Sequence, residues 1–304
     1  MPAGSPGGKS VRTAPGARSA GLHRWPGSRE AFGSLRLDFA RANPGYGLEY
    51  WPACADLPAA ESARALFVHG GEAAALVEGD GAIPARSPLG IGDLVLLRPG
   101  ERLSLDRSLD FLSIALPGPL PEALPTFVRP DWDPNLTDTP GGCAEESGAY
   151  RRILLTWLAS NGPYVHHDLN AHRVRMVDSL SHYHPRDGGF DELYLVQGLS
   201  PGARLLTSPH VDRLLAPDQL VRGELAGLVE EHPLAVGDLI WFPRETMHRA
   251  IGGVLAQVIT VPGFRPGAEI GLDHHLRAIN ERFDLRGAAG LPYREASSRG
   301  PIVK

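Results

Sequence analysis

Side chains in the second half of the sequence have the types and spacing of a metal site. His182 and His184 are separated by one residue, and alternate residues of a β-strand point to the same face about 7 Å apart. Both imidazoles can therefore bind one ion. A new apolar segment then starts with Asp191 and Glu192, where a carboxylate oxygen could be a further ligand. A third imidazole, His248, follows a later apolar segment that begins at a Gly-Asp turn.

This set of donors favours a catalytic metal site over a structural one. Three neutral nitrogens and one carboxylate, with positions left open for water or substrate, suit iron(II), manganese(II), zinc or nickel, and we prefer iron(II) or manganese(II). A structural zinc site would be closed and commonly rich in cysteine. The two cysteines, Cys54 and Cys143, lie far apart without a Cys-x-x-Cys spacing and are expected to be reduced thiols. The sequence thus predicts one divalent metal ion.

Three further side chains are predicted to act beside the metal. If the strand before the histidine pair keeps its alternation, His172 and Asp178 share its inward face. A carboxylate inside a barrel needs a partner, so Asp178 would orient a ligand or act as a base, unless a bend turns it toward solvent. Tyr194 lies two residues after Glu192 and should face inward, where its hydroxyl could donate to a substrate oxygen or its ring could pack in the core.

Short apolar segments separated by turn residues run through most of the chain, which predicts an all-β sandwich or barrel. In the first half these segments are 65–69, 73–77, 93–97 and 111–116. In the second half they are 173–184, 192–196, 203–206, 237–242 and 255–261. A Pro-rich link covers residues 117–142. Residues 272–284 have apolar positions at a spacing of three and four, which predicts a short amphipathic helix.

The length of 304 residues and an internal repeat both predict two domains. A Gly-Asp turn, an apolar strand and a proline bend occur at 92–99 and again at 237–244. The repeat places Ser104 where the second half has His248, and the first half has no His-x-His pair, so its barrel should be empty of metal. We expect a disordered basic tail over 1–30, a first barrel over 31–149, a second barrel with a terminal helix over 150–285, and a loose tail over 286–304.

The composition favours a folded protein that acts on a small molecule. Apolar residues make up 42% of the chain and charged residues 21%, with 36 glycines and 28 prolines, which is typical of a turn-rich folded protein. A net charge of −5 argues against a nucleic-acid partner, because such a protein needs a basic face. The sequence has no apolar stretch of about 18 residues and no apolar region of a secretory signal, so we expect no membrane partner and a cytoplasmic location.

The motifs resemble those of the cupin superfamily of small β-barrels. That family's first motif is a His-x-His pair followed by a Glu on the next strand, matched here by His182-Tyr-His184 and Glu192. Its second motif is a Gly-Asp turn, an apolar strand, a proline bend and a His, matched by residues 237–243 and His248. The resemblance covers the second half well and the first half only by strand pattern and repeat. It implies two tandem jelly-roll barrels with a few short helices, and a dimer is a fair expectation for the family.

One departure from the family pattern bears on the choice of carboxylate. The family's closing glycine usually lies seven residues after the Glu, whereas Gly198 lies seven residues after Asp191 and six after Glu192. The Asp-Glu pair resembles the family's usual start of this strand, which favours Glu192. Asp191 stays the alternative ligand.

A metal-free first barrel, a link and a metal-binding second barrel are also similar to the layout of the bicupin uronate isomerases. This resemblance favours isomerisation of a sugar acid or a related hydroxy-carbonyl compound. In such a reaction the metal polarises a carbonyl while a base, for which Asp178 is suited, moves a proton between adjacent carbons. The alternatives are an iron(II)-dependent dioxygenase and a non-enzymatic cupin that binds a metabolite.

Overall fold

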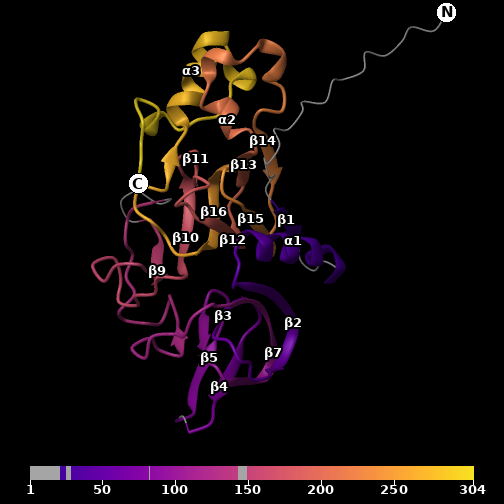
Figure 1. Cartoon of the computed structure of the whole chain (residues 1–304), viewed down its shortest axis with the longest axis vertical. Coiled ribbons are helices and arrows are strands. Elements are labelled where there is room, and N and C mark those ends of the chain that lie inside the picture. Colours follow the sequence, from indigo (N-terminus) through magenta and orange to yellow (C-terminus); the bar gives the residue numbers. More distant parts are fainter. Residues whose placement is uncertain (1–20, 25–28, 82, 143–148) are drawn as a thin grey trace, which may run out of the picture.

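The computed structural model describes residues 21–24, 29–81, 83–142 and 149–304, and its strands form two sheets (Figure 1). One sheet has the strand order β5-β4-β7-β3-β6-β8, with β2 paired to β7. The other follows the path β1-β15-β12-β16-β10-β9, to which β11, β13, β14 and β17 are attached. The predicted all-β fold with two tandem jelly-roll barrels is confirmed.

The elements of each sheet follow one another along the chain, apart from β1. The first sheet consists of β2 (Gly47–Leu57), β3 (Arg64–Gly70), β4 (Ala73–Glu78), β5 (Ala85–Leu89), β6 (Leu94–Leu97), β7 (Arg102–Ala115) and β8 (Phe127–Val128). The second consists of β1 (Gly21–Arg24), β9 (Arg151–Leu155), β10 (Asn170–Asp178), β11 (His182–Tyr183), β12 (Asp191–Leu199), β13 (Arg204–Ser208), β14 (Glu230–Pro233), β15 (Asp238–Phe242), β16 (Met247–Val261) and β17 (Ile270–Gly271). The helices are α1 (Arg29–Ala42), α2 (Val211–Leu214) and α3 (Asp273–Phe283), with 3-10 turns η1 (Pro217–Gln219), η2 (Arg222–Glu224), η3 (Gly287–Ala289) and η4 (Glu295–Ser297).

A shared hydrophobic core joins the two barrels. On β12, Tyr194 and Val196 fill the interior of the second barrel, whereas Leu193 and Leu195 pack in the core that also contains Phe67 of β3. Strands buried on both faces have continuous apolar sequences rather than alternating ones. This burial explains why β3 and β12 carry almost no polar side chains in their middles, and it fixes the second barrel against the first.

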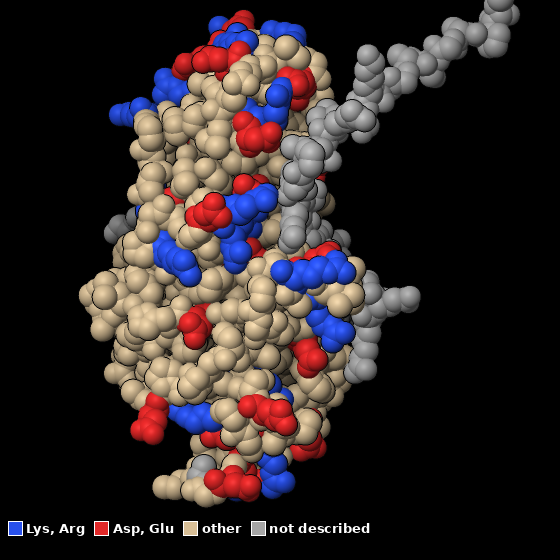
Figure 2. Space-filling model, viewed as in Figure 1, with Lys and Arg blue, Asp and Glu red and all other residues tan. Residues whose placement is uncertain are grey.

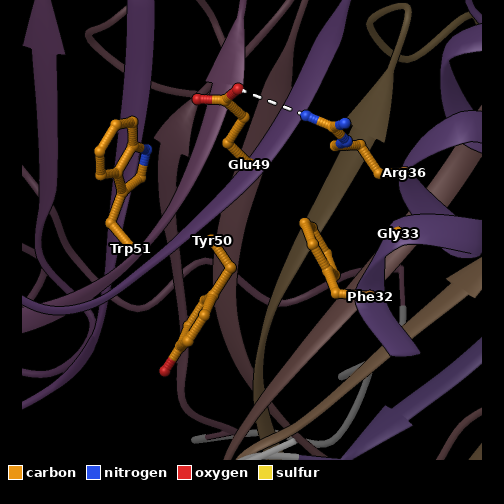
Figure 3. Close-up of a pocket in the computed structure, with 6 residues that line it drawn as sticks. All are labelled: Phe32, Gly33, Arg36, Glu49, Tyr50 and Trp51. Atoms are coloured by element: carbon orange, nitrogen blue, oxygen red, sulfur yellow. Dashed lines mark ion pairs between the residues drawn. The ribbon is translucent and has the colours of Figure 1, made fainter. Parts of the chain in front are cut away.

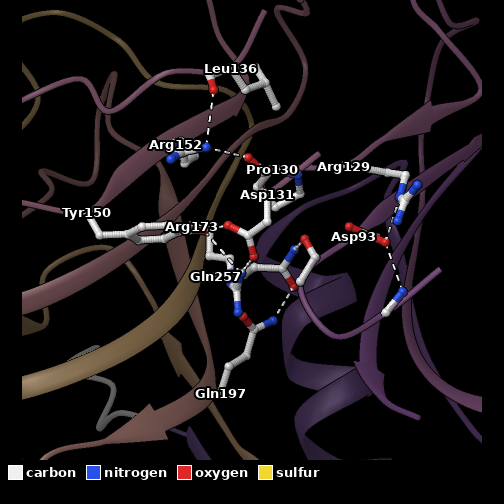
Figure 4. A network of polar contacts seen from close by, with 12 residues as sticks. Asp93, Arg129, Pro130, Asp131, Leu136, Tyr150, Arg152, Arg173, Gln197 and Gln257 are labelled. Atoms are coloured by element: carbon white, nitrogen blue, oxygen red, sulfur yellow. Dashed lines mark hydrogen bonds and ion pairs between the residues drawn. The ribbon is translucent and has the colours of Figure 1, made fainter. Parts of the chain in front are cut away.

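Polar contacts tie the repeated Gly-Asp turns to the opposite barrels. The Nε2 atom of Gln257 on β16 donates to the carbonyl of Gly92 at 2.7 Å, and Gln197 contacts Gln257 in the same network (Figure 4). In the other direction, Nε2 of His69 on β3 lies 3.1 Å from the carbonyl of Gly237. Each barrel therefore contacts the turn of its neighbour through the backbone.

Both ends of the described chain are more ordered than predicted. Strand β1 pairs with β15 and α1 begins at Arg29, so the predicted disorder through residue 30 is wrong for these segments, while residues 1–20 and 25–28 lie outside the described residues. The loose tail predicted after residue 285 is also wrong, because the Gly271 amide donates to the Ile302 carbonyl at 2.8 Å and the Lys304 amide to the Glu269 carbonyl at 2.9 Å. The last residues pair with the edge of β17. The domain boundary at 149/150 stays a prediction.

The predicted terminal helix is present as α3, with Leu276 and Ile279 buried. Cys54 is a buried free thiol, and Cys143 lies outside the described residues. Figure 2 shows basic and acidic side chains interspersed over one face of the molecule. Within the described part of the chain, none of the helices is both long and apolar enough to cross a bilayer.

Candidate metal centre

The four predicted ligands meet inside the second barrel. One donor atom from each of His182, His184, Glu192 and His248 lies within 4.8 Å of the others, and none of the four residues is more than 4% exposed. Strand pairing brings them together, because His182 of β11 lies opposite His248 of β16, and Glu192 of β12 lies opposite Thr260 on the same long strand. The structure thus assembles the two motifs into one cluster.

Backbone contacts orient two of the imidazoles. Nδ1 of His182 lies 3.1 Å from the carbonyl of Leu180, and Nδ1 of His248 lies 3.1 Å from the carbonyl of Thr246. Each Nδ1–H can donate to its carbonyl, which leaves Nε2 directed at the cluster, as is usual for metal-binding histidines. Nε2 of His248 lies 2.6 Å from Oε2 of Glu192.

The donor set fits a divalent metal ion. Ligands bound at about 2.1 Å lie at most about 4.2 Å apart, so donors within 4.8 Å of one another need only a small contraction. Nε2 of His184 is buried and has no hydrogen-bond partner among the described residues, which is unfavourable for an imidazole unless an ion satisfies it. Three nitrogens and one carboxylate oxygen suit manganese(II), iron(II), zinc or nickel. The predicted divalent-metal site is therefore present in the fold.

The electrostatics of the cluster favour an ionised carboxylate. Burial alone would raise the pKa of Glu192, but hydrogen bonds and charge interactions with His182 and His248 outweigh it and hold this pKa well below its usual value. Burial lowers the pKa of His184 well below its usual value, so this ring is a neutral donor. Burial also opposes the charged form of His182, yet Glu269 and Glu192 together raise its pKa to about 9. The cluster thus concentrates negative potential where a cation would bind.

Asp191 takes no part in the cluster, because adjacent residues of β12 face opposite sides. Its carboxylate is buried on the side of the first barrel, where Oδ2 accepts from Nδ2 of Asn43 at 2.7 Å and from Nε1 of Trp241 at 3.0 Å. The backbone amide of Arg244 donates to Oδ1 at 3.0 Å. Asp191 therefore holds the end of α1 against the second barrel, and Glu192 is the carboxylate of the cluster.

The prediction that Asp178 lies inside the barrel is wrong. The pairing of β10 with β16 shifts register between Met176 and Asp178, where β16 carries an extra residue, and regular alternation is lost at this end of β10. The side chain of Asp178 is 48% exposed and forms an ion pair with Arg249 at 2.6 Å. A residue in this place cannot serve as a base for a substrate beside the metal.

Tyr194 points inward, as predicted, but packs in the core. Its ring lies edge-on to Phe242 with 4.8 Å between centroids, and edge-on to His248 at 5.8 Å. Tyr194 does not line the cavity beside the metal cluster. The structure therefore favours support of a ligand histidine over contact with a substrate.

A cavity of about 410 Å³ lies beside the cluster, and the metal ligand Glu192 lines it. His172 also lines it, as predicted. Trp157 stacks on Phe264 with centroids 4.0 Å apart, and Phe190 lies between Phe264 and His184, at 5.4 and 3.9 Å. These rings make an aromatic wall that leads to the metal cluster.

Several polar residues of the cavity lining were not predicted from the sequence, among them Arg151, Thr260, Glu269 and Lys304. Thr260 alternates with apolar residues on a predicted strand, and this alternation was its only sequence signal. Glu269 and Lys304 come from segments beyond the last predicted strand, and no local pattern marks them. Glu269 is 7% exposed, and its Oε1 atom has no hydrogen-bond partner among the described residues.

A second cavity, of about 300 Å³, lies between α1 and β2 (Figure 3). It is lined by Phe32, Gly33, Arg36, Glu49, Tyr50 and Trp51. Arg36 and Glu49 form an ion pair at 3.6 Å, and both side chains are about half exposed. None of the four metal-cluster residues lines this cavity, so the candidate site is the cavity in the second barrel.

The two barrels and the His-His-Glu-His set resemble the arrangement of a bicupin with a metal site in its C-terminal barrel. No family model and no curated protein matches the sequence. Solved structures of oxalate decarboxylase from Bacillus subtilis are similar. One of them, described for its Mn(II) centres, has a TM-score of 0.45 and 12% identity, covering 85% of this chain and 79% of that chain. A mutant of the same enzyme has a TM-score of 0.46 and 13% identity over the same shares. At these values the likeness assigns neither an activity nor a substrate to this chain.

Proposed function

We propose that the protein is a metal-dependent isomerase of a small hydroxy-carbonyl metabolite, with a sugar acid as the favoured substrate class. The observation that carries this proposal is the buried carboxylate of Glu269, which lines the same cavity as the metal ligand Glu192 and has an oxygen without a partner. A base and a metal site that share one cavity are the two groups that proton transfer beside a carbonyl requires.

Glu269 replaces Asp178 as the candidate base. A bound divalent ion would polarise the carbonyl and hold the neighbouring hydroxyl oxygen. Glu269 would take the proton from the carbon that bears the hydroxyl and return it to the former carbonyl carbon, while the hydroxyl proton would pass to the former carbonyl oxygen. Substrate and product are therefore isomers, and the reaction consumes no oxidant. Its charge contributes to raising the pKa of His182, which supports its closeness to the cluster.

The rest of the cavity suits an anion with one apolar face. Arg151 and Lys304 line it, and a guanidinium group is well matched to a carboxylate. The stacked pair Trp157 and Phe264 offers a flat apolar surface for the C–H face of a sugar chain. Together these features favour a small organic acid as the partner, while a homodimer and a cytoplasmic location stay predictions.

An iron(II)-dependent dioxygenase is the second candidate, and the aromatic wall is the observation that favours it. An aromatic substrate could stack on Trp157 and Phe264, and the same nitrogen and oxygen donors bind iron(II). Such an enzyme would consume dioxygen in proportion to its substrate, whereas an isomerase would consume none.

Turnover by metal-loaded protein tests the proposal. The purified chain, loaded anaerobically with Mn(II), Fe(II) or Zn(II), is incubated with a panel of uronates in D₂O and followed by proton NMR. We expect conversion of aldose to ketose with deuterium incorporated next to the carbonyl. Glu269→Gln should lower the rate at least about 100-fold while metal content is unchanged. Oxygen uptake that matches substrate loss would establish the dioxygenase instead, and binding without turnover would favour a metabolite-binding cupin.

A further inference from the structure

We infer that Thr260 and His172 recognise hydroxyl groups on the body of the substrate, so that the cavity selects a polyhydroxylated acid over an acid with the same metal-binding head and an alkyl body. The inference deepens the proposed function and rests on it for the position of the head at the metal. It comes from two buried polar atoms that line the cavity and lack partners within the described residues.

Thr260 places a hydroxyl next to the metal cluster. It lies on β16 directly between Glu192 of β12 and Asn170 of β10. Side chains opposite each other in an antiparallel pair have Cβ atoms about 5 Å apart, so Thr260 is adjacent to a metal ligand. The residue is 5% exposed, and its Oγ1 atom has no partner among the described residues. A valine would fill the same volume without a stranded hydroxyl, so the oxygen has no evident packing role.

His172 provides the second polar atom, farther along the sheet. It follows Asn170 by two residues on β10, which makes it the diagonal neighbour of Thr260 at about 7–8 Å. Its Nε2 atom is buried without a partner in the described structure. Burial, with a smaller contribution from Arg151, lowers the pKa of His172 to about 3, so the ring is neutral. A neutral imidazole suits a hydroxyl group, which can both donate and accept, and leaves a carboxylate to Arg151.

The spacing of the two atoms defines the class of substrate. Because Thr260 lies beside Glu192 and His172 lies one diagonal step beyond, a ligand that contacts both must carry hydroxyls on more than one carbon. Water can satisfy such atoms in the free protein, and the hydroxyls of a polyol replace those contacts. An alkyl body would leave Oγ1 of Thr260 and Nε2 of His172 without a hydrogen-bond partner. Sites built to hydrogen-bond a hydroxyl reject ligands that lack it.

The test compares two probes with the same α-hydroxy acid head, gluconate and 2-hydroxyhexanoate, by titration calorimetry on Zn(II)-loaded protein. We expect gluconate to bind at least about tenfold more tightly. Thr260→Val and His172→Phe should each weaken gluconate binding about tenfold and change 2-hydroxyhexanoate binding less than about twofold. Thr156→Val is the matched control, because Thr156 is fully buried but does not line the cavity, and it should leave both affinities unchanged.

Metal content and melting temperature, measured for every variant, separate loss of recognition from loss of the fold, and the two substitutions give independent tests. Equal affinity for the two probes, binding of neither probe, or an unchanged ratio in both variants would overturn the inference. Gluconate has no carbonyl and cannot be isomerised. A preserved affinity ratio without turnover of any uronate would therefore reject the isomerase and keep the hydroxyl recognition.

Discussion

The two barrels are built on the same turn and can be compared residue by residue. In the first barrel the Gly92 amide donates to the Val68 carbonyl, and Oδ2 of Asp93 accepts from the Gly90 amide at 2.8 Å. In the second barrel the Gly237 amide donates to the Val196 carbonyl, and Oδ2 of Asp238 accepts from the Ala235 amide at the same 2.8 Å. The repeat seen in the sequence is thus a repeat of structure.

Counting along the paired strands from this shared turn identifies which residues of the first barrel occupy the positions of the predicted metal ligands. His182 pairs with His248 in the second barrel, and Leu57 pairs with Leu103 at the equivalent place in the first. Leu103, rather than the predicted Ser104, therefore corresponds to His248. Two imidazoles that converge on an ion are replaced by two leucines, each 1% exposed.

The position of the Glu192 carboxylate also holds a different kind of side chain in the first barrel. Glu192 lies opposite Phe242, and its counterpart Arg64 lies opposite Leu97. The guanidinium of Arg64 donates to the Pro58 carbonyl at 2.7 Å and to the Glu101 carbonyl at 3.3 Å, while its Nε atom has no partner among the described residues. The first barrel therefore has two leucines and a cation at these three positions, whereas the second barrel has two imidazoles and a carboxylate, which are groups that can bind a metal ion. That the first barrel binds no metal stays a prediction.

The largest expected difference between the barrels comes from removing two predicted metal ligands from the second barrel and their two counterparts from the first. His182→Ala with His248→Ala should abolish metal binding and lower activity at least about 1,000-fold, because the remaining donors cannot hold the ion. Leu57→Ala with Leu103→Ala should cost about 3 kcal/mol of stability per site and leave the metal in place. Elemental analysis and denaturant unfolding measure both effects. Stoichiometric metal in the double histidine variant would place the ion elsewhere.

Removal of the metal should lower the stability of the second barrel only. At a metal concentration about 1,000 times its dissociation constant, binding adds about 4 kcal/mol to the stability of the native state. After chelation we expect amide hydrogen exchange to become faster in β11, β12 and β16, which carry the ligands, while β3 and β7 keep their protection. The re-addition of Mn(II) should restore the slow exchange. Equal loss of protection in both barrels would show that the shared core couples them into one unit.

Local patterns were enough to predict the metal cluster. A His-x-His pair on one strand, a carboxylate at the start of the next and a His after a repeated turn bring His182, His184 and His248 together once the strands form an antiparallel barrel. The choice between Glu192 and Asp191 depended on which face of β12 meets the first barrel. That face is set by the shared core, which no local pattern reveals.

The parts that could not be predicted depend on backbone irregularity and on distant pairing. Alternation placed Asp178 inside, but the pairing of β10 with β16 is irregular at this point, where β16 carries an extra residue, and Asp178 lies outside. Glu269 reaches the cavity because the loop after β16 is fixed by Lys304, which lies far along the chain in a segment without periodic pattern. The metal ligands were thus predictable from spacing, and the candidate base was not.

The smallest expected effect separates Asp178, the base predicted from the sequence, from Glu269, the base proposed from the structure. Asp178→Asn removes an ion pair whose carboxylate is half exposed and screened by solvent, so we expect it to cost about 0.5 kcal/mol or less and to leave activity within about twofold. Glu269→Gln makes the same kind of change inside the cavity and should nearly abolish turnover. Both variants replace a carboxylate by an amide of the same size. A difference between their rates, measured on metal-loaded protein, therefore reflects only where the carboxylate lies. If Asp178→Asn were the inactive variant, β10 and β16 would have to pair in regular register in the active protein, and the bulge opposite Asp178 would not be a feature of that state.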